Sequence, residues 1–428
     1  MATVSWIGNA NNIAQVVTGT VTTVANGALL TATMSTKTIT YTCTASDTTT
    51  TAAAGLAALL PPTSSAAAAE FGVASFTSSG AVITATESTA GEPFAGMTGG
   101  LVFAASGGAA ITQATSQANV SQSDVNDVNN WIRSGVNAIP VNGDDMVVMN
   151  TDVPLRWNLT ALASVQLNSF TRYQSFIGTI GLPDINPLGF VEFRPTYFQF
   201  AGAAASLPIT LGLGSGQGPT RERYNVGSSK CVLNVVASGA ASDEFAVRFL
   251  GTNANNTATI LGTSVGVAYW AGETSTLASA LVDGGGSMTI GSGTTFSGTL
   301  TVQNGSVTLY ATAAAIVASN NSQVTVITLG TQVSGTVSTY ASVTAIGQST
   351  ITWNSNATIT TLTLTTGSFF DKSQDARAMT ITNSTIDGDT CQANDPNSAI
   401  TWTNATSVKN LVSSGPFIFN GTRTVKVT

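Results

Sequence analysis

Apolar and polar positions alternate in different ways along the chain, and the first pattern is a mixed one. Residues 36–45 (TKTITYTCTA) alternate apolar side chains with Thr, which predicts a strand. Residues 46–60 (SDTTTTAAAGLAALL) place Ala and Leu at helical spacing before a Pro pair, which predicts a helix. Residues 71–88 hold two alternating runs around Ser-Ser-Gly, which predicts a hairpin. Residues 1–112 therefore form a small α+β or β-sandwich module.

A polar segment without periodicity, residues 113–128, follows and is interpreted as a linker. Beyond residue 150 strand-like runs recur with turn residues between them and with no long helical pattern. An apolar–Thr–apolar triplet recurs at steps of 24, 19, 19, 17 and 21 residues from residue 300 onward. Its clearest copies are Met288-Thr289-Ile290, Leu300-Thr301-Val302, Val324-Thr325-Val326, Leu362-Thr363-Leu364, Met379-Thr380-Ile381 and Ile400-Thr401-Trp402, with a looser one at Val343-Thr344-Ala345.

A period near 20 residues with strand chemistry is typical of a parallel β-solenoid, because short strands bury their inward faces only when successive coils stack. We therefore expect a mainly β protein in which residues 129–428 form a right-handed parallel β-solenoid. The alternative is a β-sandwich, which would place hairpin turns every 8–12 residues and pair the strands antiparallel.

Aromatic residues gather between residues 150 and 200, at the start of the expected solenoid. Stacked aromatic rings would cap the open N-terminal end of the core or form a contact between protomers. Tyr197 and Phe198 are candidates for such a contact, and so are Arg221 and Arg223, which flank Glu222 in the densest charge run. That run is otherwise a local ion pair or a solvated loop.

Charge is scarce in this chain of 428 residues, and its distribution excludes several function classes. Asp, Glu, Lys and Arg make up 8% of the residues, the net charge is −7, and there is no His. Without a basic cluster a nucleic-acid partner is not expected. No secretion signal and no membrane span are visible. The three cysteines are far apart and are expected as buried thiols.

The segment NNWIRSGVNAIPVNGDDMVVMN, residues 129–150, is expected to be the entry into the solenoid. Trp131 and Pro140 would anchor the chain, and Gly143, Asp144 and Asp145 would turn it into the first coil. The two acids are not expected to act as a catalytic pair, because neighbouring strand residues point to opposite faces. A chain starting near residue 129 should then fold without residues 1–112.

No other group of side chains predicts a catalytic, cofactor or metal site. The acids at Asp387 and Asp389 flank a glycine only once, whereas calcium-binding solenoids repeat such a motif coil after coil. Asp243, Glu244, Asp371 and Asp375 are isolated loop acids, and residues 246–370 hold just Glu273 and Asp283. A polysaccharide depolymerase would need paired carboxylates in a groove.

Three stretches carry a resemblance to a known group of proteins. They are TITYTCTA with TTTTAAAGLAALL and SSGAVITATESTAGEPF, the junction NNWIRSGVNAIPVNGDDMVV, and SFTRYQSFIGTIGLP with GFVEFRPTYF. The chain resembles phage-borne and bacterial surface β-solenoid proteins that have an N-terminal α+β module and an NW-x-G-x-P-x-x-GDxV entry motif. The resemblance implies a solenoid fold and a role at a particle or cell surface, and it carries over no active site.

The expected function is that of a non-enzymatic structural protein on the virion surface, as a fibre or a capsid or tail decoration. Homotrimers are the expected state, with the module attached to other virion or surface proteins and with a host surface glycan as a candidate ligand. The alternatives are a bacterial cell-surface adhesin or filament subunit, located extracellularly, and a tailspike polysaccharide depolymerase.

Overall fold

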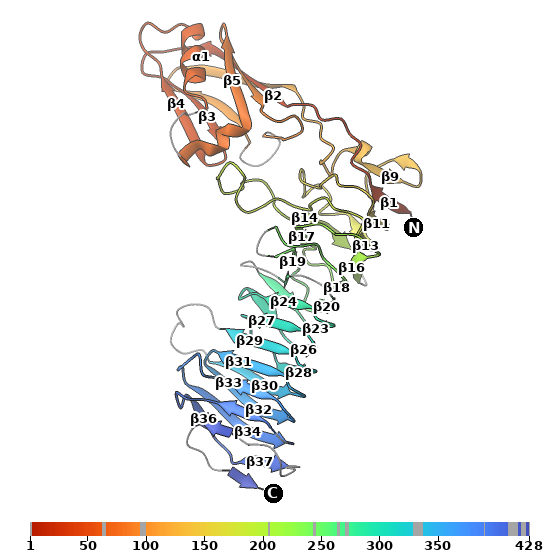
Figure 1. Ribbon diagram of the computed structural model, residues 1–428. Helices are drawn as coiled ribbons and strands as arrows, with labels where there is room; N and C mark the ends of the chain where they lie inside the picture. The colour runs from red at the N-terminus through yellow and green to blue at the C-terminus, as the bar shows by residue number, and fades with distance from the viewer. Residues whose placement is uncertain are drawn as a thin grey trace.

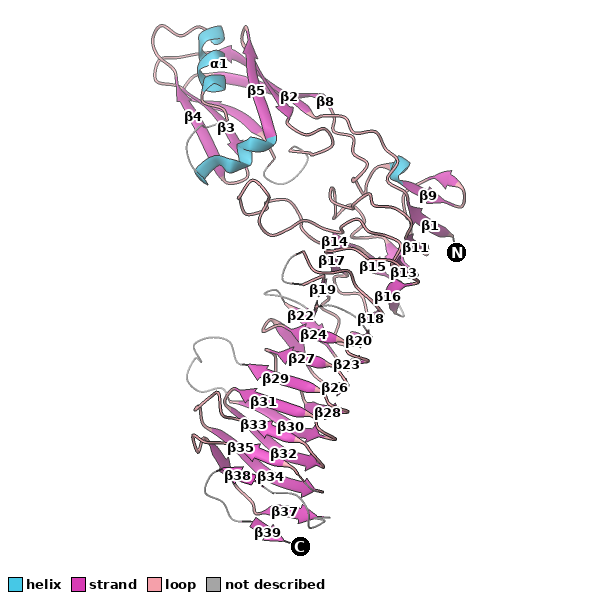
Figure 2. Cartoon of the chain, viewed as in Figure 1, coloured by secondary structure: helices cyan, strands magenta, loops and turns pink. Residues whose placement is uncertain are grey.

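The structure is a computed structural model that describes residues 2–61, 66–94, 100–203, 206–242, 245–262, 266–269, 274–327, 337–388, 390–409, 418–420 and 425–427. The protein is mainly β and has two parts, which we call the module (residues 16–117) and the rod (residues 3–6 and 131–427) (Figure 1). The module lies at one end of the elongated rod. Figure 2 shows that the rod is built from strands, whereas the longer helices belong to the module.

The module consists of two antiparallel sheets and a helix, so it is an α+β unit. One sheet has the order β5 (Ala74–Ser79), β6 (Val82–Glu87), β2 (Val16–Thr23), β8 (Ala110–Gln117), and the other has the order β4 (Lys37–Thr42), β3 (Leu29–Met34), β7 (Val102–Ser106). The helices are α1 (Thr49–Ala58) and the 3₁₀ helix η1 (Ala66–Val73). The expected helix and hairpin are both present. Thr48 caps α1, and its side chain and that of Thr51 accept each other's backbone N–H.

The rod is formed by two long parallel sheets that advance together along its length. The first contains β1 (Thr3–Trp6), β11 (Asp145–Val148), β13 (Ser169–Tyr173), β16 (Leu207–Leu213), β18 (Cys231–Val235), β20 (Thr257–Leu261), β23 (Ser279–Asp283), β26 (Thr299–Gln303), β28 (Ala315–Ser319), β30 (Ser338–Ala345), β32 (Ala357–Thr365), β34 (Met379–Asp387), β36 (Ile400–Trp402), β37 (Thr406–Lys409) and β39 (Val425–Val427). Two short strands, β9 (Trp131–Arg133) and β10 (Val136–Asn137), join its first edge in antiparallel pairing. The 3₁₀ helix η2 (Val128–Asn130) leads into β9.

The second sheet has eleven strands in the described part of the chain. They are β14 (Phe198–Gln199), β17 (Glu222–Asn225), β19 (Val247–Leu250), β21 (Val267–Tyr269), β24 (Ser287–Ile290), β27 (Ser306–Leu309), β29 (Gln323–Ile327), β31 (Thr350–Asn354), β33 (Phe369–Asp371), β35 (Gln392–Asn394) and β38 (Ile418–Asn420). Two smaller parallel pairs are β12 (Gln166–Leu167) with β15 (Ala201–Gly202), and β22 (Ser275–Leu277) with β25 (Thr294–Phe296). The parallel pairing excludes the antiparallel sandwich for the rod.

Strand alternation explains how the rod builds one core. In β26, Leu300 and Val302 are buried and Thr301 faces outward, and the same alternation recurs in β29 and β32. Because successive strands pair in register, outward Thr residues stack on one another, as Thr344 does on Thr363. The aliphatic side chains join a continuous hydrophobic core that extends from Val4 to Ile400.

One corner of the rod repeats the same backbone device from coil to coil. A residue with positive φ is followed by a small residue, and the next residue begins a strand of the second sheet. The positive-φ residues are Gly285, Asn304, Asn321, Gln348, Gly367 and Thr390, and the small ones are Gly286, Gly305, Ser322, Ser349, Ser368 and Cys391. We call the small residues the corner column.

The serines of the corner column bind carbonyl groups of their own turn and of the preceding coil. The Ser349 hydroxyl donates to the carbonyl of Ile346 at 2.7 Å, and the Ser368 hydroxyl donates to the carbonyl of Ala345 at 2.8 Å. All three serines are buried. A small side chain that carries a donor therefore both fits the corner and satisfies carbonyl groups there.

The triplets that revealed the period are strands, but they do not all occupy one register. Leu300-Thr301-Val302 lies in β26 of the first sheet, whereas Val324-Thr325-Val326 lies in β29 of the second. Within the first sheet Leu300 pairs with Ile316 and Ile316 pairs with Val343, so consecutive steps are 16 and 27 residues. The apparent regularity near 20 residues is thus an average over coils of unequal length.

The structure also moves both boundaries of the expected module. β1 (Thr3–Trp6) pairs in parallel with β11 and in antiparallel with β9, and Val4 and Trp6 belong to the core of the rod. At the other boundary β8 extends to Gln117, so the sheet of the module continues into the expected linker 113–128. The module is therefore an insertion between the first strand of the rod and the rest of it.

Candidate binding site at the junction of module and rod

Two chain segments connect the module to the rod, and Asn130 clamps them together. Ile13 and Val120 form an antiparallel bridge between the segments. The fully buried Asn130 accepts a hydrogen bond from Ala10 N at 2.8 Å and donates to the carbonyls of Ser121 at 2.7 Å and Asp124 at 2.9 Å. The junction thus depends on the amide that directly precedes Trp131, which the sequence analysis did not single out.

Trp131 and Pro140 are both buried at this end of the rod. The Trp131 indole N–H donates to the carbonyl of Val125 at 2.9 Å, and its ring meets the ring of Trp6 edge-on with centroids 4.9 Å apart. The two indoles cover the first coil of the core, with one supplied from each side of the inserted module.

Gly143, Asp144 and Asp145 lie where the chain turns into β11. Gly143 has φ of +82°, which a glycine adopts without steric cost. Asp144 is buried and accepts hydrogen bonds from Arg133 Nε at 2.8 Å and Val141 N at 2.9 Å. Asp145 is half-buried, and the sequence expectation of opposite faces agrees with this alternation.

The carboxylate of Asp145 is held by the neighbouring coil. Its Oδ1 accepts hydrogen bonds from Ser169 Oγ at 2.6 Å and Asn168 Nδ2 at 2.9 Å. The bond from Ser169, followed by that from Asn168, lowers the pKa of Asp145 below its ordinary value. Asp144 and Asp145 therefore bind different partners, and each fixes the backbone.

A loop of the rod, residues 183–194, docks the module. Phe190 is buried within the hydrophobic core of the module, and Phe193 packs against it. The side chain of Leu188 lies against Gly72, at 3.3 Å from where a Cβ atom would stand. The aromatic residues were expected to act within the rod or between protomers, but this pair attaches the rod to its own module.

Arg194 is the polar centre of that contact. Its guanidinium is buried and donates to Glu192 Oε1 at 2.8 Å, to Glu92 Oε1 at 3.2 Å and to the carbonyl of Pro93 at 3.3 Å. It also lies 4.6 Å from the ring centroid of Trp157. Burial tends to raise the pKa of the Glu192 carboxyl, but the hydrogen bond and the charge of Arg194 outweigh this effect and hold that pKa below its ordinary value.

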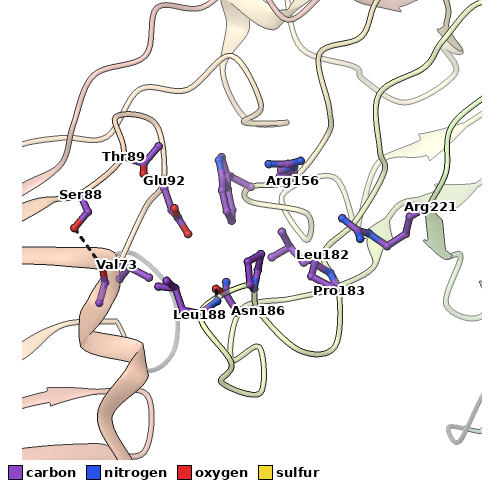
Figure 3. A pocket seen from close by; sticks show the side chains of 13 residues that line it. Val73, Ser88, Thr89, Glu92, Arg156, Leu182, Pro183, Asn186, Leu188 and Arg221 are labelled. Atoms are coloured by element: carbon purple, nitrogen blue, oxygen red, sulfur yellow. Dashed lines mark hydrogen bonds between the residues drawn. The ribbon is translucent and has the colours of Figure 1, made fainter. Parts of the chain in front are cut away.

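A pocket of about 410 Å³ opens between the module and the rod (Figure 3). Its walls carry the charged side chains of Arg156 and Arg221 from the rod and Glu92 from the module. The remaining lining residues are Gly72, Val73, Ser88, Thr89, Trp157, Leu182, Pro183, Asn186, Pro187 and Leu188. The pocket thus combines apolar walls with a few convergent polar groups, as small-molecule sites do.

The residues that were expected at a protomer contact have other partners within the chain. Phe198 is completely buried in the core of the rod, which leaves it no surface for a second copy. Arg223 is buried and pairs with Asp184 at 2.5 Å, and its guanidinium lies 5.8 Å from the centre of the Tyr197 ring. Arg221 lines the pocket.

Asp184 connects two coils because its carboxylate pairs with Arg223 and also with Arg248, whose Nη1 lies 2.8 Å from Asp184 Oδ2. Burial opposes ionisation of Asp184, but Arg223 and Arg248 hold the pKa of its carboxyl below the ordinary value. Burial also raises the pKa of Tyr197. The charge run 221–223 therefore forms ion pairs across coils.

The third member of the run, Glu222, belongs to a buried network. Arg172 in β13 donates to both carboxylate oxygens of Glu222, at 2.9 and 2.5 Å, and Tyr224 donates its hydroxyl at 2.6 Å. Arg172 and Glu222 are fully buried. The sequence signal was present in SFTRY, where Arg172 occupies an inward position of the alternation.

The other candidate acids form no common site in the described part of the chain. No group of three or more Asp, Glu, Cys or His side chains able to hold a metal ion occurs among the described residues. Asp371 accepts from Asn394, and Asp375 pairs with Lys372 and Arg377. Asp389, Asp243, Glu244 and Glu273 lie outside the described residues. The three cysteines are buried free thiols, as expected.

No helix among the described residues has the length and apolar character needed to span a membrane. Comparison of the chain with known protein families, with curated proteins and with solved structures finds no match.

Proposed function

We propose that the rod is a right-handed parallel β-solenoid and that the protein is a non-enzymatic structural component of a phage particle, as a fibre or a surface decoration. The carrying observation is the continuous parallel register of the two long sheets around one core. Such an array acts as a stiff spacer because each coil contacts its neighbours along the whole length.

The surface of the rod supports this role. Outward positions are occupied largely by Thr, which stacks in register between coils, as in the series Thr308, Thr325 and Thr352. Buried cations are paired within the chain, as Arg172 is with Glu222 and Lys372 is with Asp375. A neutral outer face with stacked hydroxyls is compatible with side-by-side packing of copies, and we propose a homotrimer.

The attachment role falls to the module, which is inserted at the first coil and is fixed there by Asn130 and Arg194. We propose that it binds other virion proteins while the rod projects from the particle. A cell-surface adhesin would use the same architecture on a bacterium.

Imaging of the native assembly with an antibody against the rod tests this function. We expect label on released phage particles and a sedimentation mass of three chains for the purified protein. Label on the bacterial surface without particles would favour the adhesin, and label on neither would refute the structural role. Turnover of host polysaccharide by the purified protein would refute its non-enzymatic character.

A further inference from the structure

The pocket between module and rod has the features of a ligand site that no part of the proposed structural role requires. Its volume of about 410 Å³ lies within the range of small-molecule pockets. The walls come from both parts of the protein (Figure 3). One lining residue, Glu92, is also the partner of Arg194 in the docking contact. The pocket therefore shares Glu92 with the ion pair that joins the module to the rod.

The positive charge at the pocket is unusual for this chain, which has a net charge of −7. Most buried or half-buried cations are matched to an acid, as Arg133 is to Asp144. Arg156 is an exposed cation, and among the residues that the structure describes it takes part in no ion pair. Its guanidinium stands at the pocket together with that of Arg221. A planar guanidinium binds a carboxylate through two parallel hydrogen bonds.

The remaining walls discriminate between anions. Glu92 is engaged by Arg194 but keeps about a quarter of its side chain exposed, so its carboxylate can accept hydrogen bonds from hydroxyl groups. A carboxylate in the wall would repel a phosphate dianion, whereas it favours a singly charged ligand that is rich in hydroxyls. Trp157, Leu182 and Pro183 add apolar surface on which the C–H face of a sugar ring can lie.

We propose that this pocket binds a carboxylate-bearing sugar residue of an acidic polysaccharide. Arg156 and Arg221 hold the sugar carboxylate, Glu92 and Thr89 bind its hydroxyl groups, and the apolar wall supports the ring. The choice of a polysaccharide rests on the proposed exterior location, while the binding chemistry rests on the pocket alone.

Calorimetric titration of the purified full chain with oligogalacturonate tests this site. The probes for comparison are neutral galactose oligomers of equal length and inorganic phosphate. We expect binding of oligogalacturonate and no binding of the neutral oligomer. Binding of phosphate with similar strength would overturn the assignment to a sugar, and no binding of oligogalacturonate would overturn the site.

The Arg156→Met variant tests whether the ligand binds in this pocket. Arg156 is exposed and makes no ion pair in the described structure, so the variant is expected to keep its unfolding temperature. We expect affinity for oligogalacturonate to fall at least tenfold. Arg156→Lys should have intermediate affinity, because lysine keeps the positive charge but lacks the planar guanidinium that binds a carboxylate through two hydrogen bonds. Lys230→Met, which removes an exposed cation elsewhere on the rod, is the matched control.

Equal affinities for Arg156→Met and Lys230→Met would overturn the pocket as the binding site. This outcome is independent of the imaging experiment, because a purified chain can bind the acidic oligomer whether or not it occurs in particles. Failure of the site and failure of the particle role are therefore distinguishable.

Discussion

The module and the rod both bury aliphatic side chains, but they treat buried charge in opposite ways. In the rod, the buried Arg172 and Glu222 neutralise each other, and Tyr224 adds a hydrogen bond. In the module, the buried Glu87 at the end of β6 makes no ion pair with any residue that the structure describes, and burial raises the pKa of its carboxyl to about 7. A buried charge that is paired stays ionised near neutral pH. An unpaired buried carboxyl instead takes up a proton, which avoids the free-energy cost of burying a charge.

The two parts also differ in how their strands find partners. The strands of the module pair antiparallel with one another, both in short hairpins such as β5 with β6 and across the module, as β2 does with β8. The first strand of the rod pairs with a strand about 140 residues later, across the entire inserted module. The rod therefore depends on residues that a domain boundary near residue 112 would assign to the module.

Removing residues 1–128 is expected to have the largest effect. The truncated chain loses β1, which exposes the edge of β11 and removes Val4 and Trp6 from the core. Loss of a buried Trp alone costs about 3–5 kcal/mol, so we expect the truncated protein to aggregate or to unfold at much lower temperature. Solubility and thermal unfolding followed by Trp fluorescence measure this.

An internal deletion provides the control for that truncation. Ile13 and Val120 are bridge partners, so residues 14–119 can be replaced by a short Gly-Ser linker while β1 is retained. In this variant Phe190 becomes exposed because the module that buries it is absent, but the rod is expected to unfold in one cooperative transition. A truncated chain as stable as the internal deletion would show that β1 is dispensable.

The next effect is expected at the buried ion pair. Arg172→Met leaves Glu222 charged and buried, which costs about 3–5 kcal/mol. The double variant Arg172→Met/Glu222→Leu should recover part of this loss, because it removes the uncompensated charge. The remaining loss reflects the hydrogen bonds that Gln174, Ala237 and Tyr224 no longer make with the pair. Urea unfolding of the two single variants and the double variant gives the coupling energy.

A half-exposed ion pair in the same rod serves as the matched control. Arg248 pairs with Asp184, whose side chain is 56% exposed. Arg248→Met should therefore cost less than about 1 kcal/mol. Equal losses for Arg172→Met and Arg248→Met would contradict the idea that burial decides the value of these pairs.

Local features of the module were predictable from sequence because they depend on neighbouring residues. The helix within residues 46–60 and the hairpin within 71–88 follow from spacing and turn chemistry, and both are present. β8 was missed because both of its faces are largely exposed and polar, which looks like a linker. β1 was missed because four residues carry little signal and its partners are distant in sequence.

The candidate site was less predictable because its parts are far apart in the chain. Arg194 meets Glu92 across about 100 residues, and no spacing rule predicts that meeting. The charge run 221–223 was recognised as unusual, but its partners Arg172 and Asp184 come from other coils. The inward position of Arg172 was the one signal that pointed to a buried pair.

The module should lose stability as pH rises toward neutrality, because its buried Glu87 takes up a proton in the native state. Burial raises the pKa of Glu87 from its ordinary value of 4.5 to about 7, so the native state binds more protons than the unfolded state between these pH values. Stability of the module therefore falls as pH rises from 4.5 to 7, by about 3 kcal/mol in total, and is constant above that range. Glu87→Gln should remove this loss and stabilise the module at pH 8.

Hydrogen exchange of amides in α1 and β2 measures this prediction, because none of the six Trp residues lies within residues 16–117 and Trp fluorescence reports on the rod. Asp47→Asn in the same module is the control. The pKa of Asp47 is lowered, first by the hydrogen bond from the Thr44 backbone, so its titration lies below this pH range. A slope that persists in Glu87→Gln would assign the pH dependence to another group.

The smallest expected effect tests the hydrogen bonds of the serines in the corner column of the rod. The Ser349 hydroxyl donates to the carbonyl of Ile346, and its oxygen accepts from Ser322 N at 3.3 Å. Ser349→Ala removes both bonds and should cost about 1 kcal/mol, whereas Ser349→Cys should cost less because Cys391 already fills the equivalent corner position. Cys391→Ser is expected to leave the urea midpoint nearly unchanged. If Ser349→Ala is as stable as the parent chain, the corner serines are retained for their small size alone, and the repeated hydrogen bonds contribute nothing to the stacking of the coils.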